Sequence, residues 1–306
     1  MNTINSLENI NLEKESVVTI GNFDGLHLGH LELIKKTSDY AKKNNLNSVV
    51  FTFSNHPLNY FKSNHIKNII SNEQKIDIIN SLGIDIIINI KFDEFMTKID
   101  KYTFVKDILK ESLKAKKIIV GHDFTFAKKK EGNVDTLIEL SKEFGFCVEV
   151  IDEIKINQKR ISSTHIRHLI ENGNVNEVKS YLGRNYSLDG IVVHARKLGR
   201  TIGFPTANML FDEKILIPKG GIYASKVFID DKVYFGATNI GFNPTVNGNK
   251  LSIETNIINF NEDIYDKRIK VEFLERIRDE KKFNSLDELK NQLKKDIEFV
   301  WENYLQ

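Results

Sequence analysis

The first half of the chain alternates short runs of β-branched and apolar residues with longer stretches of helical periodicity. The strand-like runs cover residues 16–20, 48–53, 85–90, 117–120 and 146–151. Helical patterns lie between them, over residues 31–43, 73–82, 102–113 and 134–144. Strands that alternate with helices of this length predict an α/β domain with a parallel sheet covered on both faces. Ligands bind to such sheets at the carboxyl ends of the strands, so functional residues are expected there.

The pattern changes after Gly183, where helical periodicity is absent for about a hundred residues. Glycines and prolines separate short β-like runs over residues 188–193, 222–229, 233–238, 251–258 and 269–274. This pattern predicts a small antiparallel barrel or sandwich, with Pro205, Pro218 and Pro244 at turns or loops. A capping-box pattern at Ser285 then opens an amphipathic helix that extends to about Tyr304. We therefore expect two domains, residues 1–184 and 185–306.

Composition narrows the classes of function. A chain of 306 residues is long enough for two hydrophobic cores. Its net charge of +2 gives no basic excess that would indicate nucleic-acid binding. The N-terminus has no signal-peptide pattern, and no apolar run approaches the ~20 residues that span a bilayer. We expect a cytoplasmic protein with no membrane partner.

The single cysteine, Cys147, excludes intramolecular disulfides and a metal site built from several cysteines. Its neighbours are apolar, so the sequence predicts an inert thiol in the core. Nothing in the sequence fixes the oligomeric state, and a monomer or weak homo-oligomer is expected.

The strongest functional signal is residues 21–30, Gly-Asn-Phe-Asp-Gly-Leu-His-Leu-Gly-His, which follow a strand and open a helix. Glycines let the backbone approach a phosphate, and a helix N-terminus supplies N–H donors and a partial positive charge. His27 and His30 are three residues apart, so both can face one ligand and donate to phosphate oxygens. The alternatives are a zinc pair, which would need further ligands, or two surface histidines.

Two further stretches follow predicted strands. Residues 52–57 place His56 at the end of the second strand, although His-Pro often marks only a turn. Residues 120–126 place Asp123 where it could bind a ribose hydroxyl or a metal, while the two phenylalanines beside it are more typical of a core.

A fourth stretch, residues 161–167, combines small hydroxyl side chains with a cation. Ser162, Ser163 and Thr164 are predicted to form a helix cap whose hydroxyls and N–H groups can hold a polyphosphate, with Arg167 one turn further on.

In the C-terminal half, residues 198–208 form a loop with two glycines, an arginine and a proline. Pro205 fixes the backbone just before Thr206, whose hydroxyl, like the carbonyl of Asn208, is suited to Mg²⁺. The alternative is a structural turn with a polar surface. Strand alternation places Glu254 on the same side as Ser252 and Asn256. A glutamate that faces such a loop can deprotonate an alcohol, whereas one that does not is an ordinary surface residue.

Taken together, these motifs resemble the prokaryotic bifunctional riboflavin kinase/FAD synthetase family, over about residues 15–300. The resemblance implies a Rossmann-like nucleotidylyltransferase domain followed by a six-stranded Greek-key β-barrel with a terminal helix. The first domain would transfer AMP from ATP to FMN, and the second would phosphorylate riboflavin. Riboflavin, FMN and ATP would be the partners, and Mg²⁺ the cofactor.

The resemblance also implies roles for single residues. His27, His30 and Glu254 would be catalytic, and Thr206 and Asn208 would bind the metal. Ligand-binding positions in the first domain would be Gly21, Asn22, Phe23, Asp24, Gly29, His56, Asp123, Ser163, Thr164 and Arg167. Those in the second would be Gly203, Pro205, Thr206 and Asn208. The chain departs from the family pattern at Ala127, where glycine is usual, and at Asn256 and Asn259, where histidine and aspartate are common.

Three alternatives remain open. A nucleotidylyltransferase acting on a small alcohol phosphate would explain the first half only. A flavin-sensing regulator with degenerate catalysis predicts the loss of Glu254 or a motif histidine, and neither is lost. A protein in which one domain alone is active would show only one of the two products.

Overall fold

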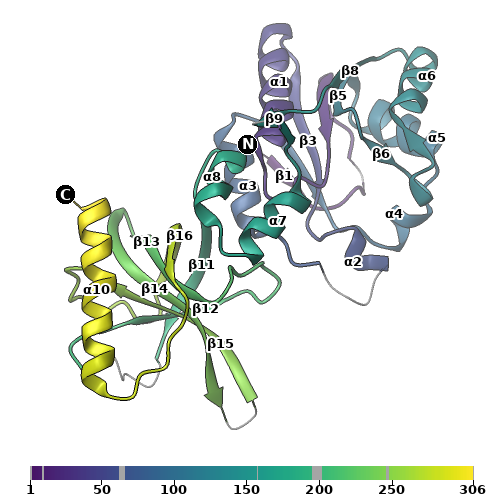
Figure 1. The fold of residues 1–306 in the computed structure, drawn as a ribbon. Helices are drawn as coiled ribbons and strands as arrows, with labels where there is room; N and C mark the ends of the chain where they lie inside the picture. The colour runs from purple at the N-terminus through teal and green to yellow at the C-terminus, as the bar shows by residue number, and fades with distance from the viewer. Residues whose placement is uncertain are drawn as a thin grey trace. The chain divides into compact units, whose positions relative to one another are not determined.

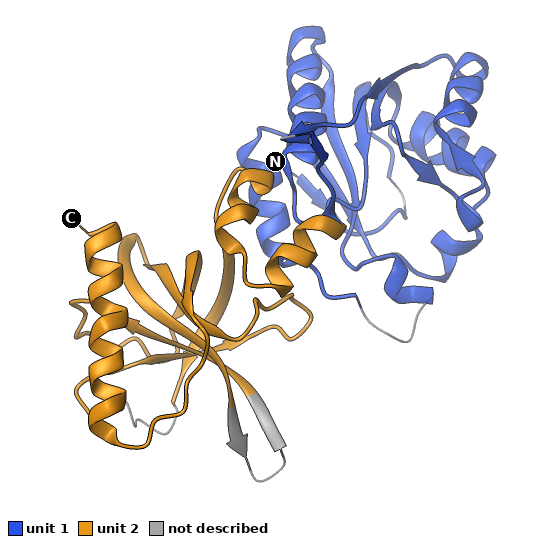
Figure 2. Cartoon of the chain, viewed as in Figure 1, with its two compact units in different colours: residues 1–163 blue, residues 164–306 orange. Residues whose placement is uncertain are grey.

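The computed structural model describes residues 2–8, 10–61, 66–156, 158–194, 202–245 and 248–305, without the side chains of 243–245 and 248–250. The chain forms two compact units, Met1–Ser163 and Thr164–Gln306 (Figures 1 and 2). The helices α7 (Ser163–Glu171) and α8 (Val175–Leu182) are grouped almost entirely with the second unit. The expected boundary at 184/185 stays a prediction about where the two functions separate.

Unit 1 is built on a six-stranded sheet in which every pair is parallel. The strand order is β1-β4-β3-β2-β5-β8. The bounds are β1 Asn2–Ile4, β2 Ser16–Ile20, β3 Asn47–Phe53, β4 Ile86–Ile90, β5 Ala115–Gly121 and β8 Cys147–Ile151. The direction of winding reverses between β2 and β5, which is where ligand crevices open in such sheets. The α/β prediction is confirmed, although the three-residue strand β1 was too short to predict.

Helices cover this sheet close to the expected ranges. They are α1 Leu28–Asn44, α2 Leu58–Phe61, α3 Asn72–Ser81, α4 Glu94–Lys98, α5 Lys101–Thr103 and α6 Val134–Phe144. The pattern predicted over 102–113 is α5 continued as a π-helix, Phe104–Ser112. Two short hairpins, β6–β7 (Thr125–Phe126, Gly132–Asn133) and β9–β10 (Lys155–Ile156, Lys159–Arg160), follow β5 and β8.

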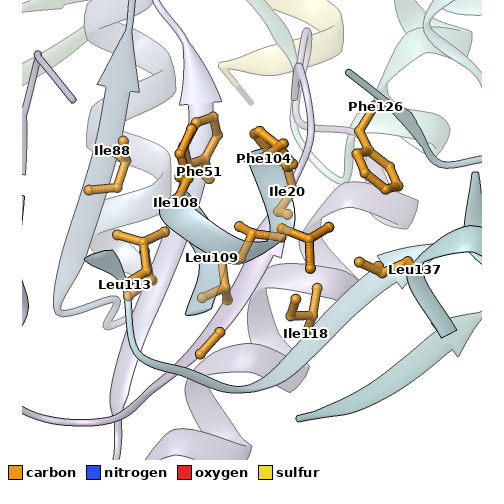
Figure 3. Packing of buried hydrophobic residues seen from close by; sticks show 14 of the residues in the cluster. Ile20, Phe51, Ile88, Phe104, Ile108, Leu109, Leu113, Ile118, Phe126 and Leu137 are labelled. Carbon is orange, nitrogen blue, oxygen red and sulfur yellow. The ribbon is translucent and has the colours of Figure 1, made fainter. Parts of the chain in front are cut away.

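The main core lies between one face of the sheet and the π-helix. Ile20, Phe51 and Ile88, from three neighbouring strands, pack against Phe104 and Leu109 (Figure 3). Each such side chain contributes roughly 1.5–3 kcal/mol when it is fully buried. All five residues of β2 are buried, as expected for a strand covered on both faces. This core holds the carboxyl end of β2 in place, and the first motif begins there.

The predicted core position of Cys147 is wrong. Its side chain is exposed. The physical reason is that β8 is an edge strand, paired with β5 alone. Apolar neighbours in sequence indicated a strand but not its place in the sheet.

Unit 2 contains a closed antiparallel barrel with strand order β11-β12-β15-β14-β13-β16, which confirms the predicted barrel. The bounds are β11 Tyr186–Val193, β12 Ala207–Phe211, β13 Gly221–Ile229, β14 Lys232–Thr245, β15 Gly248–Ile257 and β16 Arg268–Arg278. The sequence did not reveal β12, because it directly continues the Gly- and Pro-containing loop. Pro244 lies in β14, not in a loop. Beyond Ile240, β14 pairs with β15 but no longer with β13, so Pro244 lies in an edge segment, where proline is tolerated.

The terminal helix α10, Leu286–Tyr304, begins where the sequence predicted. Ser285 Oγ accepts from Glu288 N at 3.1 Å, but the Glu288 carboxylate accepts from Asn284 N at 3.0 Å, so the capping box is only half formed. A bidentate ion pair fastens the helix to the barrel. Arg278 Nε and Nη2 donate to the two carboxylate oxygens of Asp296 at 2.9 and 2.6 Å, and Asp296 is only 2% exposed.

We predict that Asp296→Ala destabilises unit 2 by roughly 3 kcal/mol, because it leaves the Arg278 guanidinium beside a buried, vacated site. Trp301, the only tryptophan of the chain, lies on α10 and reports urea unfolding by fluorescence. Asp279→Ala is the matched control, since Asp279 pairs with Arg276 at the surface and 78% of the Asp279 side chain is exposed. This variant should hardly change the urea concentration at the midpoint of unfolding. Equal shifts in both variants would contradict the assignment.

Candidate functional site

A cavity of about 210 Å³ opens in unit 1 at the carboxyl ends of β2, β5 and β8. It is lined by His27, Gly29, His30, Leu33, Gly121, His122, Asp123, Ile151, Asp152, Glu153, Ile154, Arg160, Ile161, Ser162 and Ser163. Nine of these residues come from the first, third and fourth sequence motifs, and the others are Leu33, Arg160 and the segment 151–154. The fold thus brings these three motifs together at the crevice that the strand order predicts.

The two motif histidines stack on each other at the start of α1. Their ring centroids are 3.6 Å apart with an interplanar angle of 15°. His27 is the N-cap residue, and its Nδ1 accepts from His30 N at 3.3 Å. The proton of neutral His27 is therefore on Nε2, as a donor. Burial, with a smaller contribution from His27, holds the pKa of His30 well below its usual value.

Phe23 packs its ring edge-on against His30, with centroids 5.3 Å apart. Phe23 is 1% exposed, so it supports the histidines from behind. A Cβ on Gly21 would lie 2.8 Å from the Phe23 ring, and one on Gly29 would lie 3.2 Å from the His27 ring. These glycines therefore make room for the aromatic packing, a reason that the sequence alone did not reveal.

Asn22, Asp24 and His56 lie in a neighbouring polar cluster, around a small cavity that Lys75 also lines. Asp24 Oδ1 accepts from Ile69 N at 2.9 Å. His56 Nδ1 accepts from Leu58 N at 3.2 Å. Both side chains thus fix the loops on which they lie.

Sequence reasoning missed Lys75, a buried lysine on α3. Its ammonium donates to the carbonyl of Phe53 at the end of β3. Burial lowers the pKa of Lys75 to about 8, against the opposing attraction of Asp24. The available signal was its spacing of four residues from Ile79, which puts a cation on the buried face of the helix.

The remaining predicted residues of the first half are Asp123, Ser163, Thr164 and Arg167. Asp123 is exposed and forms an ion pair with Arg160. Ser163 Oγ donates to the Asp24 carbonyl at 3.0 Å, and Ser163 is the first residue of α7, not a residue before it. Thr164 and Arg167 follow on the same helix, which the contacts assign to unit 2 from Thr164 onward.

In the barrel, β15 separates two cavities. Thr255 and Ile257 line one of about 280 Å³, and Glu254 and Asn256 line another of about 210 Å³. Alternating residues of a strand point to opposite faces, and this alternation divides the four side chains between the cavities. Thr206 lines both cavities.

The loop before β12 is held against β15. Asn208 stands directly opposite Glu254 in the ladder between these strands. Asn256 Nδ2 donates to the Pro205 carbonyl at 2.8 Å, so asparagine at this position anchors the loop. Gly203 has φ +87°, a conformation that glycine adopts without strain. Arg200, in the same predicted loop, lies outside the described residues.

None of the described helices has the length and apolarity that crossing a bilayer demands. In the same part of the chain, no three His, Cys, Asp or Glu side chains are grouped to bind a metal.

Comparison with known proteins divides the chain in the same way as its motifs. Residues 9–165 match the FAD synthetase family, and residues 182–304 match the riboflavin kinase family. A bifunctional riboflavin kinase/FMN adenylyltransferase of Buchnera aphidicola (subsp. Schizaphis graminum) is 37% identical over 97% of this chain and 96% of that protein. The protein of the same name from Haemophilus influenzae is 36% identical over 97% of each chain.

Among solved structures, one match covers nearly the whole chain. It is described as a macrolide-efflux protein from Streptococcus pneumoniae, with a TM-score of 0.90, 33% identity and coverage of 99% of this chain and 98% of that one. The match supports the fold of each unit.

We predict that His30→Gln reduces the loss of folding stability that occurs as the pH becomes acidic. Because the pKa of His30 is lowered in the folded protein, the unfolded chain binds its proton first as pH falls through about 6.5, and stability is lost. Thermal unfolding followed by circular dichroism at pH 7.5 and 5.5 should show a smaller decrease for the variant than for wild type. His168→Gln, at an exposed position of α7, should leave the decrease unchanged. If His30→Gln lost as much thermal stability between pH 7.5 and 5.5 as the wild-type protein does, the prediction would be contradicted.

Proposed function

The chain belongs to the bifunctional riboflavin kinase/FMN adenylyltransferase family, and from this premise we propose how its two halves convert riboflavin to FMN and FMN to FAD. The observation that carries the proposal is that the two halves of the chain have separate cavities. Each matched half has its own cavity, lined by the motif residues of that half. We assign adenylyl transfer to residues 1–184 and phosphorylation of riboflavin to residues 185–306.

In the kinase half, the proposed reacting groups meet at Thr206. Riboflavin occupies the cavity of Glu254, and ATP occupies the cavity on the other side of β15. Glu254 accepts the proton of the ribityl 5′-hydroxyl, whose oxygen then attacks the γ-phosphorus of ATP. A new P–O bond forms, the bond from the γ-phosphorus to the bridging oxygen breaks, and ADP leaves.

The donor set near Thr206 fits a hard cation. The Thr206 hydroxyl and the Asn208 carbonyl are oxygen donors, and Mg²⁺ is typically held by few protein oxygens together with substrate phosphates. When bound, Mg²⁺ would neutralise charge on the ATP phosphates. Asn256 keeps Thr206 in position by holding the carbonyl of the preceding Pro205.

In the adenylyltransferase half, a phosphate oxygen of FMN attacks the α-phosphorus of ATP, and pyrophosphate leaves. His27 donates its Nε2 proton to a phosphate oxygen as negative charge develops, and His30 acts beside it. We assign contact with the departing phosphates to Ser163, Thr164 and Arg167.

The other predicted residues line or support this site. We assign binding of flavin or nucleotide to Gly21, Asn22, Asp24, Gly29, His56 and Asp123, and a supporting role to Phe23. Asp123 would exchange its ion pair with Arg160 for a ligand hydroxyl. We further propose a cytoplasmic enzyme, monomeric or weakly self-associating, with small molecules as its partners.

Two substitutions should separate the activities. His30→Ala should lower FAD formation from FMN by at least ~100-fold, the usual cost of losing a group that stabilises transition-state charge, and should spare FMN formation. Glu254→Ala should lower FMN formation from riboflavin by ~100- to 10,000-fold, the usual contribution of a general base, and should spare FAD formation from supplied FMN. Chromatography of flavins after incubation with ATP and Mg²⁺ measures both.

Each variant carries its own control, because the second activity of the same chain reports whether the protein is folded. Loss of both products in either variant would count against two independent sites. If the wild-type protein makes FAD from FMN but no FMN from riboflavin, only the first half is active, and Asn256 and Asn259 become the positions to test.

A further inference from the structure

Asn239 lies on β14 directly beside Glu254. The two residues stand opposite each other in the ladder between β14 and β15, and Asn208 stands opposite Glu254 on β12. Residues directly opposite on antiparallel strands project from the same face, with Cβ atoms about 5 Å apart. Asn208, Glu254 and Asn239 therefore form one row of polar side chains across three neighbouring strands.

Within the described residues, the side-chain oxygen of Asn239 has no hydrogen-bonding partner. Oδ1 is buried, and no donor in the described part of the chain reaches it. Buried polar atoms are nearly always paired in native proteins, and an exception requires an explanation. Because Asn239 lines the same cavity as Glu254, a donor on the ligand that fills this cavity is the natural partner.

The lining of the cavity contains both polar and apolar side chains. Glu254 and Asn239 of the polar row line it, together with Thr206 and Asn256. α10 and the loop before it contribute the apolar side chains Phe283, Leu289, Leu293 and Ile297, beside the charged Lys281 and Asp296. Riboflavin has a flat aromatic ring joined to a chain of hydroxyl groups, so the ring can contact the apolar side chains and the hydroxyl groups the polar ones.

We propose that Asn239 is a riboflavin-binding residue of the kinase site. Its Oδ1 accepts a hydrogen bond from a ribityl hydroxyl and thereby holds the 5′-hydroxyl within reach of Glu254. The proposal rests on the kinase function proposed above, and adds a residue that recognises the hydroxylated chain of the substrate.

Asn239→Leu removes the acceptor at nearly constant size. The KM for riboflavin should rise about fivefold, the factor that corresponds to one hydrogen bond of ordinary net strength. The KM for ATP and the rate of FAD formation from FMN should stay at wild-type values.

Lumiflavin, which carries the flavin ring with a methyl group in place of the ribityl chain, separates recognition from packing. Its inhibition constant against riboflavin should be the same for wild type and Asn239→Leu. Equal weakening of riboflavin and lumiflavin would mean that the substitution only distorts the cavity. An unchanged KM for riboflavin would mean that solvent satisfies Oδ1. Either result overturns the proposal.

If the wild-type protein forms no FMN, the kinase function fails and Asn239 is tested by binding alone. Quenching of flavin fluorescence then compares riboflavin with lumiflavin in wild type and Asn239→Leu. A loss of affinity confined to riboflavin supports the role of Asn239 without catalysis, and a loss shared by both ligands, or none, refutes it.

Discussion

The alternation of side chains along β15 is the constraint on which the barrel half depends. A strand has a period of two, so neighbouring residues must face opposite sides. Here both sides are cavities. Glu254 and Asn256 face one, while Thr255 and Ile257 face the other. A slip of one residue in the pairing of β15 would exchange these sets and turn the glutamate away from the loop that Asn256 anchors. The register with β12 and β14 is therefore as necessary to the chemistry as the glutamate itself.

In the α/β half, a tightly packed pair of rings has the corresponding role. His27 and His30 stack at the N-terminus of α1, where the helix supplies a partial positive charge. Phe23 supports them, and the glycines at 21 and 29 leave the space that this packing needs. The lowered pKa of His30 keeps the imidazole neutral at physiological pH. The site thus begins without the repulsion that two adjacent imidazolium ions would exert.

The sequence predicted whatever depends on local pattern. The longer strands and helices of the first unit, the start of α10 at Ser285 and the opposite orientations of Glu254 and Ile253 all follow from periodicity and capping. Features that depend on distant pairing were beyond its reach. The exposure of Cys147 requires knowing that β8 is an edge strand, and the place of Asn239 beside Glu254 requires the register of two strands. Lys75 was missed because burial of a cation contradicts the usual preference of lysine for the surface.

The exposed thiol of Cys147 also makes the molecule easy to label. The chain has one cysteine and one tryptophan, and they lie in different compact units, on β8 and α10. Both side chains are exposed. A thiol-reactive acceptor dye on Cys147 would therefore form a unique energy-transfer pair with Trp301, without any engineered residue. Such a pair would report the separation of the two units, and whether ATP or a flavin changes it, in the unmodified sequence.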